Sequence, residues 1–166
     1  MLKQPIRVLI VDDQEIVRRR VREALAKSPH VEIIGEAQNG QAAVGLALEL
    51  KPDVVLMDVV MPGLNGIEAT RQIVDAAPEI NVLAHTARVE RQTADEMFGA
   101  GARGFLAKSG NARELLRAVR SVAAGMYFCT PCLNPATASG RVPGERNTEN
   151  PQRGSSLLRH PSNHSG

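Results

Sequence analysis

The stretch that decides the fold is VLIVDDQE, which runs from Val8 to Glu15. An unbroken apolar segment ends there in Asp12 and Asp13, two adjacent acids whose charges repel. Such an apolar run is typical of a strand that is covered on both faces, as strands are in parallel sheets. Residues 15–27 follow with the spacing of an amphipathic helix, which Asp13 is placed to cap. The apolar side of this helix is predicted to consist of Ile16, Val17, Val21, Ala24 and Leu25.

The same strand–helix alternation recurs along the chain as far as residue 126. Strands are predicted at residues 6–11, 31–37, 53–58, 80–86 and 104–108. Helices are predicted at residues 15–27, 40–50, 66–76, 89–101 and 111–125, with Asn39 and Asn111 as caps of the second and fifth. Right-handed crossovers between such strands give an α/β fold with a doubly wound five-stranded parallel sheet.

Composition limits the classes of protein to consider. The chain of 166 residues is 43% hydrophobic, enough for one domain with an ordinary core. Its net charge is only +2 and its aromatic content 2%, which argues against a nucleic-acid surface built on basic and stacking side chains. The apolar runs are too short for a membrane span or a signal peptide, so a soluble cytoplasmic protein without a membrane partner is expected.

The character of the sequence changes near its C-terminus. We expect a domain over residues 4–126 and a disordered tail over residues 127–166, because the latter segment is rich in Pro, Gly and Ser and poor in large aliphatic side chains. Cys129 and Cys132 form a CxxC pair within it, and His160 and His164 are the residues that could complete a zinc site. Two incidental thiols are the simpler interpretation.

Polar residues stand at the predicted strand ends. Asp12 and Asp13 end the first strand, Asp58 the third, Thr86 the fourth and Lys108 the fifth. The carboxyl ends of parallel strands share one edge, so these side chains should converge. Crowded carboxylates suit Mg²⁺, which shares its coordination shell with phosphate, and beside it an aspartate can attack a phosphoryl group. Each residue alone has a structural explanation, but five at matching strand ends indicate a site.

The segments VLIVDDQE, DVVLMDVVMPGLNGIEA, HTA and GARGFLAKS resemble, in order and spacing, the receiver domain of two-component response regulators. The resemblance covers residues 4–126 and is greatest to regulators of the LuxR/NarL type. It implies the flavodoxin-like (βα)5 receiver fold and a phosphorylation-dependent signalling protein. It also implies that the domain is not an enzyme beyond catalysing its own Mg²⁺-dependent phosphorylation and dephosphorylation.

The resemblance implies a role for each matching residue. Asp58 would accept phosphate from a sensor histidine kinase, and Lys108 would pair with that phosphate. Thr86 would reach for the phosphoryl oxygen, and Phe105 would change rotamer as Thr86 moves. The ligands implied for Mg²⁺ are Asp12, Asp13, Asp58 and the backbone carbonyl of Val60.

The family comparison also bears on output. Phosphorylation would switch the face formed by the fourth helix, the fifth strand and the fifth helix, for partner binding or dimerisation. The first and fifth helices are a second candidate for a homodimer face. Residues 129–166 show no recognition-helix pattern, so direct DNA binding by this chain is not expected. The alternative is a LuxR/NarL-type transcriptional regulator whose DNA-binding domain is truncated, frameshifted or supplied by a partner.

Several residues allow two interpretations. His85 should point away from the site if strand alternation holds, as a packed neutral core histidine. Arg18, Arg19, Arg20 and Arg22 form either a solvated helix face or a kinase-docking face. The resemblance implies that Val60 and Arg88 flank the phosphoryl group, and because neither side chain orients an attacking water, we expect slow autodephosphorylation.

Two other functions fit less well. A dinucleotide site would use GAGARG at residues 99–104, but that motif needs a strand before it and a helix after it, the reverse of the order here. A haloacid-dehalogenase-like phosphatase expects a second aspartate two residues after its nucleophile, where this chain has Val60.

Overall fold

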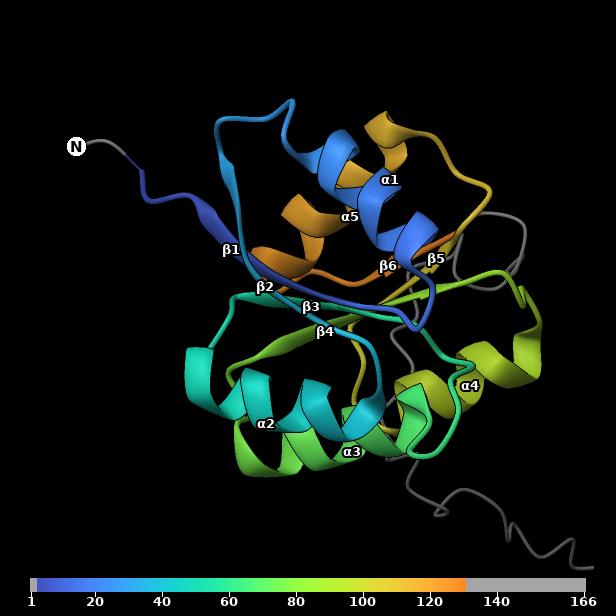
Figure 1. The fold of residues 1–166 in the computed structure, drawn as a ribbon. Helices are drawn as coiled ribbons and strands as arrows, with labels where there is room; N and C mark the ends of the chain where they lie inside the picture. The colour runs from blue at the N-terminus through green and yellow to red at the C-terminus, as the bar shows by residue number, and fades with distance from the viewer. Residues whose placement is uncertain (1–2, 131–166) are drawn as a thin grey trace, which may run out of the picture.

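The computed structural model describes residues 3–130, which form a parallel sheet between two layers of helices. The strands are β1 (Ile6–Val11), β2 (Val31–Ala37), β3 (Val54–Met57), β4 (Asn81–Thr86), β5 (Gly104–Ala107) and β6 (Phe128–Cys129). The helices are α1 (Glu15–Leu25), α2 (Gly40–Leu50), α3 (Gly66–Ala76), α4 (Arg91–Gly99) and α5 (Ala112–Ala123). The strand order is β2-β1-β3-β4-β5-β6, and all neighbours are parallel. Helices α1 and α5 cover one face of the sheet, and α2, α3 and α4 cover the other (Figure 1).

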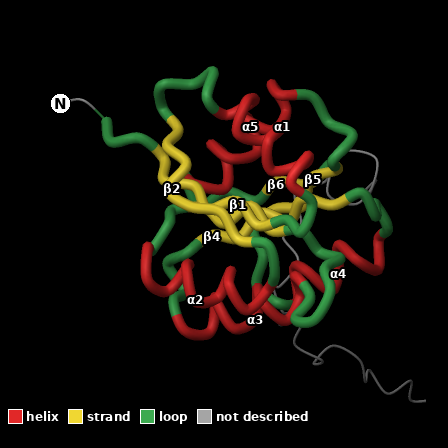
Figure 2. Tube along the Cα trace, in the orientation of Figure 1, coloured by secondary structure: helices red, strands yellow, loops and turns green. Residues whose placement is uncertain are grey.

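Alternate side chains of the strands fill two cores, one on each face of the sheet. In β1, Leu9 and Val11 pack in the core beneath α2, α3 and α4, whereas Val8 and Ile10 pack in the core beneath α1 and α5. All four are at most 2% exposed. Figure 2 shows the sheet edge-on between the two helical layers. The structure confirms the predicted doubly wound parallel sheet, and it explains why the strands read as continuous apolar runs.

Asparagine side chains cap three of the helices. Asn39 Oδ1 accepts the Ala42 amide at 2.8 Å, and Asn111 Oδ1 accepts the Glu114 amide at 2.9 Å, as predicted. Asn65 caps α3 in the same way. The helices of the described part run from 9 residues in α4 to 12 in α5, and none of them is long and apolar enough to cross a membrane.

The start of α1 differs from the prediction. The helix begins at Glu15 with Gln14 in the N-cap position, so the predicted cap at Asp13 is wrong. The Gln14 amide instead donates to Asp12 Oδ1 at 2.9 Å. The helix starts at residue 15 as predicted, but Gln14 rather than Asp13 precedes its first turn, and Asp13 is left exposed at the sheet edge.

The buried side of α1 also differs. Ile16, predicted to be a core residue, is 53% exposed. Arg18 takes its place on the buried side together with Val21 and Leu25, and it is only 4% exposed. Residues three and seven positions apart share one helix face, so Arg18, Val21 and Leu25 form one stripe.

The sheet continues past the predicted domain boundary. Residues 128–129 form β6, which pairs with Gly104 and Phe105 of β5. The Thr130 amide donates to the Phe105 carbonyl at 2.9 Å, and Thr130 Oγ1 accepts the Ala107 amide at 2.9 Å. Backbone groups on the edge of β5 need hydrogen-bond partners, and this two-residue strand supplies them. A strand of two residues is too short to show a periodic pattern in the sequence.

The other predictions for the C-terminal segment lie outside the described residues. These are the disordered tail beyond residue 130, the CxxC partner Cys132 and the candidate ligands His160 and His164.

Candidate functional site

The carboxyl-terminal edge of the sheet brings together the polar residues that end its strands. Asp12 and Asp13 follow β1, Asp58 follows β3, Thr86 ends β4 and Lys108 follows β5. The three aspartates each offer a carboxylate oxygen, and these oxygens lie within 4.8 Å of one another. A pocket of about 630 Å³ opens here, with Asp13, Asp58, Thr86 and Lys108 among its lining residues. The fold therefore places at one edge the five side chains that parallel-sheet geometry predicted to meet.

Lys108 bridges two of the carboxylates. Its Nζ lies 2.7 Å from Asp12 Oδ2 and 3.2 Å from Asp58 Oδ1. Asp12 and Asp58 are only 2% and 4% exposed, and buried charges are costly unless they are paired. The ammonium therefore offsets much of the repulsion between the two buried acids.

Backbone hydrogen bonds from neighbouring strands position the two buried acids. The Asp12 amide donates to the Ala37 carbonyl at 3.1 Å, at the end of β2. The Asp58 amide donates to the Val11 carbonyl at 2.9 Å, at the end of β1. The hydrogen-bond ladder of the sheet thus continues through both aspartates, and the strands fix the backbone positions from which the two carboxylates extend.

A close backbone approach behind Asp58 requires glycine. A Cβ atom on Gly66 would lie 2.0 Å from the Asp58 carbonyl oxygen, far inside van der Waals contact. The Gly66 amide donates to the Val59 carbonyl at 2.9 Å, which closes the loop between β3 and α3. The loop can fold tightly against the phosphoacceptor candidate only because residue 66 has no side chain.

The donor set fits a hard divalent cation. Three carboxylates converge, and Asp12 Oδ2 is buried and accepts no hydrogen bond from the described residues, although Lys108 Nζ is its ion-pair partner. Carboxylate oxygens of this kind are the ligands that Mg²⁺ prefers. Val60 lines the same pocket with its side chain turned outward, 58% exposed. Its carbonyl as a further ligand stays a prediction.

Thr86 and Phe105 lie at the junction between the site and the core. Thr86 is 1% exposed, and its Oγ1 accepts the Arg88 amide at 3.0 Å. Phe105 is fully buried in the core on the α2, α3 and α4 side of the sheet. The two residues stand on adjacent strands, β4 and β5.

The environment of Asp58 favours its neutral form. Burial, followed by repulsion from Asp12, raises the pKa of Asp58 from 3.8 to about 6, while Lys108 opposes the shift. Without a metal ion the folded protein therefore holds a proton on Asp58 at a pH where the unfolded chain has lost it. The carboxylate is ionised at neutral pH, but at a cost in stability.

His85 lies on the opposite face of β4, as strand alternation predicted. It lines a separate cavity of about 320 Å³ with residues of α1 and the segment after β5, among them Val21 and Asn111. Burial, together with repulsion from Lys108, lowers the pKa of His85 from 6.5 to about 4. The imidazole is therefore neutral at pH 7, in agreement with its prediction as a packed core histidine.

These two groups give the metal-free protein a testable pH dependence. Stabilisation from protonated Asp58 is lost as the pH rises through about 6, whereas stabilisation from neutral His85 is lost as the pH falls from about 6.5 towards 4. The effects have opposite signs and overlap in the native chain. The substitution Asp58→Asn removes one of them.

The native chain loses the stabilisation from protonated Asp58 as the pH rises, whereas Asp58→Asn does not. The free energy of unfolding of Asp58→Asn minus that of the native chain should therefore increase by about 2–3 kcal/mol from about pH 4 to pH 7. Urea denaturation in EDTA at several pH values measures this difference. A difference that does not change with pH would contradict the raised pKa of Asp58.

Sequence reasoning missed one buried charge next to the site. Arg18 was grouped with Arg19, Arg20 and Arg22 on an exposed face, yet its side chain is 5% exposed and contacts the Asp12 backbone. Its spacing from Val21 and Leu25 was the available signal, but an arginine at such a position is ordinarily assumed to reach solvent.

Comparison with known proteins shows the family of this chain. Residues 8–120 match the family model described as the response regulator receiver domain. The chain belongs to this family. Response regulator GacA of Pseudomonas viridiflava is 41% identical over 126 residues, which are 76% of this chain and 59% of that protein. Transcriptional regulatory protein LiaR of Bacillus subtilis (strain 168) is 41% identical over 120 residues, 72% of this chain and 57% of that protein.

A solved structure of a receiver-family protein supports the fold. The two-component response regulator of the LuxR family from Aurantimonas sp. SI85-9A1 has a TM-score of 0.77 and 33% identity, covering 82% of this chain and 98% of that one. The receiver-domain chain spans less than two thirds of the length of the two curated relatives, GacA and LiaR.

Proposed function

We propose that this receiver-domain chain is a two-component response regulator that takes phosphate from a sensor histidine kinase onto Asp58. The observation that carries the proposal is the convergence of three carboxylates and Lys108 at one edge of the sheet, with Asp58 buried among them. Family membership supports the same reaction. The domain acts on no other substrate, and its chemistry is confined to its own phosphorylation and dephosphorylation.

In the reaction, an Asp58 carboxylate oxygen attacks the phosphorus of the phosphohistidine. A P–O bond forms, and the P–N bond breaks with its electrons returning to the imidazole of the kinase. Asp12, Asp13 and Asp58, with the Val60 carbonyl, would hold Mg²⁺, and the ion would supply positive charge next to the phosphoryl oxygens. Lys108 Nζ, already 3.2 Å from Asp58 Oδ1, donates to the phosphoryl group as negative charge builds up.

Phosphorylation would act on the rest of the domain through Thr86 and Phe105. The new phosphate adds about 1.5–2 negative charges and strong acceptors, which attract the Thr86 hydroxyl away from the Arg88 amide. Phe105 then repacks beside it, and the α4, β5 and α5 face changes its packing. This face, or the face of α1 and α5, would bind a partner or a second copy of the chain. The protein would act in the cytoplasm.

A second candidate function is transcriptional regulation. The curated relative LiaR is named as a transcriptional regulatory protein, and the chain covers 57% of its length. Regulation of transcription would then depend on DNA binding through the C-terminal segment or on the DNA-binding domain of a partner. Salt-dependent DNA binding by the purified chain would favour this function.

Intact-mass measurement tests the proposed phosphorylation. The native chain incubated with acetyl phosphate and Mg²⁺ should gain the mass of one phosphoryl group, and EDTA should prevent the gain. A chain that gains none, although it is folded and Mg²⁺ is present, would contradict the proposal.

The phosphorylated state is expected to be long-lived. Val60 and Arg88 line the pocket beside Asp58, and their side chains are exposed there without a group that orients an attacking water. Replacing them together by Val60→Asn and Arg88→Glu should shorten the lifetime about tenfold, less than the 10²–10⁴ typical of a positioned general base. The decay of the phosphorylated mass after removal of acetyl phosphate measures this lifetime. An unchanged lifetime would show that these side chains do not control hydrolysis.

A further inference from the structure

We propose that Arg18 is a positioning residue for the metal-binding acids. It would fix the peptide bond between Asp12 and Asp13, and with it the directions in which the two carboxylates point. The inference rests on the proposed function, because it assigns Arg18 a role at the same Mg²⁺ site. Arg18 itself touches neither the metal nor the phosphate in this role.

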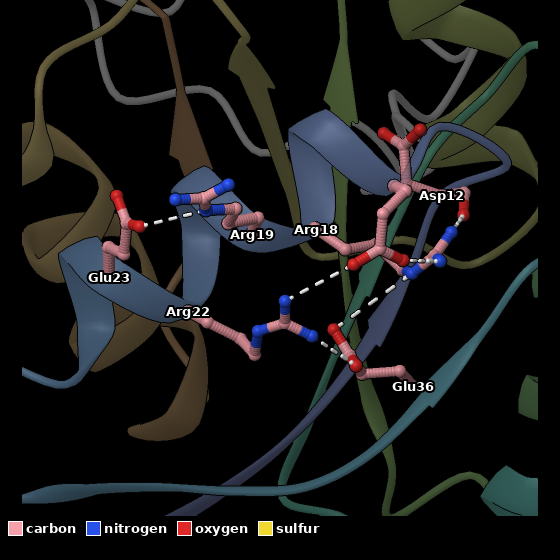
Figure 3. A network of polar contacts seen from close by, with 7 residues as sticks. Asp12, Arg18, Arg19, Arg22, Glu23 and Glu36 are labelled. Carbon is pink, nitrogen blue, oxygen red and sulfur yellow. Dashed lines mark hydrogen bonds and ion pairs between the residues drawn. The ribbon is translucent and has the colours of Figure 1, made fainter.

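The contact that carries the inference is a buried hydrogen bond. Arg18 Nη1 donates to the Asp12 carbonyl oxygen at 2.7 Å, and the Arg18 side chain is 5% exposed (Figure 3). That carbonyl belongs to the peptide that joins Asp12 to Asp13. Rotation of this peptide would turn the Asp13 carboxylate away from Asp12 and Asp58, so the hydrogen bond restrains the geometry of the acidic cluster.

Arg18 is itself held by a network of acids. Its guanidinium donates to Glu15, and its Nε lies 3.9 Å from Glu36 Oε1. Arg22 joins the same two carboxylates, with Nη1 2.6 Å from Glu36 Oε2 and Nη2 3.3 Å from Glu15 Oε1. Figure 3 shows Arg18 and Arg22 from α1 converging with Glu36, at the end of β2. A guanidinium fixed by several partners at once is a rigid donor.

The Asp12 segment is thereby restrained from three sides. The Asp12 amide donates to Ala37 of β2, the Gln14 amide donates to Asp12 Oδ1, and Arg18 holds the Asp12 carbonyl. Removing a group that hydrogen-bonds a metal-ligating residue commonly weakens metal binding 10–100-fold. Arg18 bonds the main-chain carbonyl of such a ligand residue, Asp12, and would act on its carboxylate through the backbone.

The neighbouring Arg19 provides a matched control. Its side chain is 65% exposed and lies 3.2 Å from Glu23 on the same helix, with no contact to Asp12 (Figure 3). Arg19 therefore fits the interpretation as part of a solvated helix face. Arg18, one residue earlier, carries the same charge and differs in being buried against the acidic loop.

The test compares Arg18→Met, Arg18→Lys and Arg19→Met with the native chain. Phosphorylation by acetyl phosphate is followed as a function of Mg²⁺ concentration, and Mg²⁺ affinity is measured separately by calorimetry without a phosphodonor. Arg18→Met should need about tenfold more Mg²⁺ for half-maximal rate, with the rate at saturating Mg²⁺ little changed. Arg18→Lys should recover part of the affinity, and Arg19→Met should match the native chain.

The double variant Arg18→Met, Glu36→Gln guards against simple unfolding. In Arg18→Met the buried Oε1 of Glu36 loses its nearby cation while Arg22 still bonds Oε2, and Glu36→Gln removes that charge. The double variant should therefore be at least as stable as Arg18→Met and still show the weaker Mg²⁺ binding. Native Mg²⁺ affinity in both variants, with only a loss of thermal stability, would overturn the inference, as would a native chain that binds no Mg²⁺. If the native chain binds Mg²⁺ but takes no phosphate, the proposed function fails while calorimetry still decides the role of Arg18.

Discussion

The substitution Lys108→Met is expected to slow phosphorylation of Asp58 by about 10²–10³-fold, the usual cost of removing one preorganised donor from a site where charge develops. Lys108 Nζ lies 2.7 Å from Asp12 Oδ2 and 3.2 Å from Asp58 Oδ1, and its side chain is only 17% exposed. The ammonium is therefore in place before phosphate arrives, so no reorganisation is needed in the transition state. Methionine keeps the length and the apolar contacts of the side chain but removes the charge.

The rate of phosphorylation by acetyl phosphate at saturating Mg²⁺ measures this effect. Lys27→Met is the matched control, because Lys27 is exposed near the end of α1 and makes no contact with the aspartates. It should phosphorylate at the native rate. A Lys108→Met protein that is folded and phosphorylates as fast as the control would show that Lys108 has no part in the chemistry.

The substitution Phe105→Ala is expected to lower the free energy of unfolding by about 3–5 kcal/mol. Phe105 is fully buried, and its ring lies in the core that β5 shares with α3 and α4. Truncation removes the transfer free energy of the ring and leaves a cavity that the surrounding side chains fill only in part. A loss of this size is a large part of the 5–15 kcal/mol typical of a domain.

Urea denaturation measures this loss, and Phe98→Ala provides the comparison. Phe98 on α4 is only partly buried and lies beside Tyr127 with the rings tilted by 48° and their centroids 6.3 Å apart. Phe98→Ala should lower the free energy of unfolding clearly less than Phe105→Ala does. Phe105→Leu, which fills much of the same volume, should retain most of the stability and so allow phosphorylation to be studied in a folded variant. Equal losses for Phe105→Ala and Phe98→Ala would contradict the packing described here.

The central features of the site were predictable because they depend on parallel-strand geometry. Asp12, Asp58, Thr86 and Lys108 each follow or end an apolar run, and parallel strands bring such ends together. The caps Asn39 and Asn111 were equally predictable, because an N-cap depends only on the residues next to the start of the helix. Predictions of this kind need only the periodicity of the apolar residues and the polar residues at which each apolar segment ends.

The features that were missed depend on tertiary partners. Arg18 is buried because Glu15, Glu36 and the Asp12 carbonyl surround it, and no local pattern reveals partners that come from β2. Asp13 is not the cap of α1, because Gln14 holds the N-cap position and its amide donates to Asp12 Oδ1. Ile16 is turned towards solvent, because Arg18, Val21 and Leu25 form the buried stripe of α1.

The strand β6 is a third such case. Two residues carry no detectable period, and they pair only because the edge of β5 offers backbone groups. Thr130 adds a side-chain contact, its Oγ1 accepting the Ala107 amide one residue before Lys108. The folded part of the chain therefore extends past the boundary at which the composition changes.

The position of the phosphate is the most direct test of the proposed function. The protein phosphorylated by acetyl phosphate is reduced with borohydride, which converts a phosphoaspartate to homoserine, and the modified residue is located by peptide mass spectrometry. We predict homoserine at residue 58 in the native chain and at no position in Asp58→Asn. Homoserine at Asp12 or Asp13 in the native chain, or equal labelling of Asp58→Asn, would contradict the assignment of Asp58 as the phosphoacceptor.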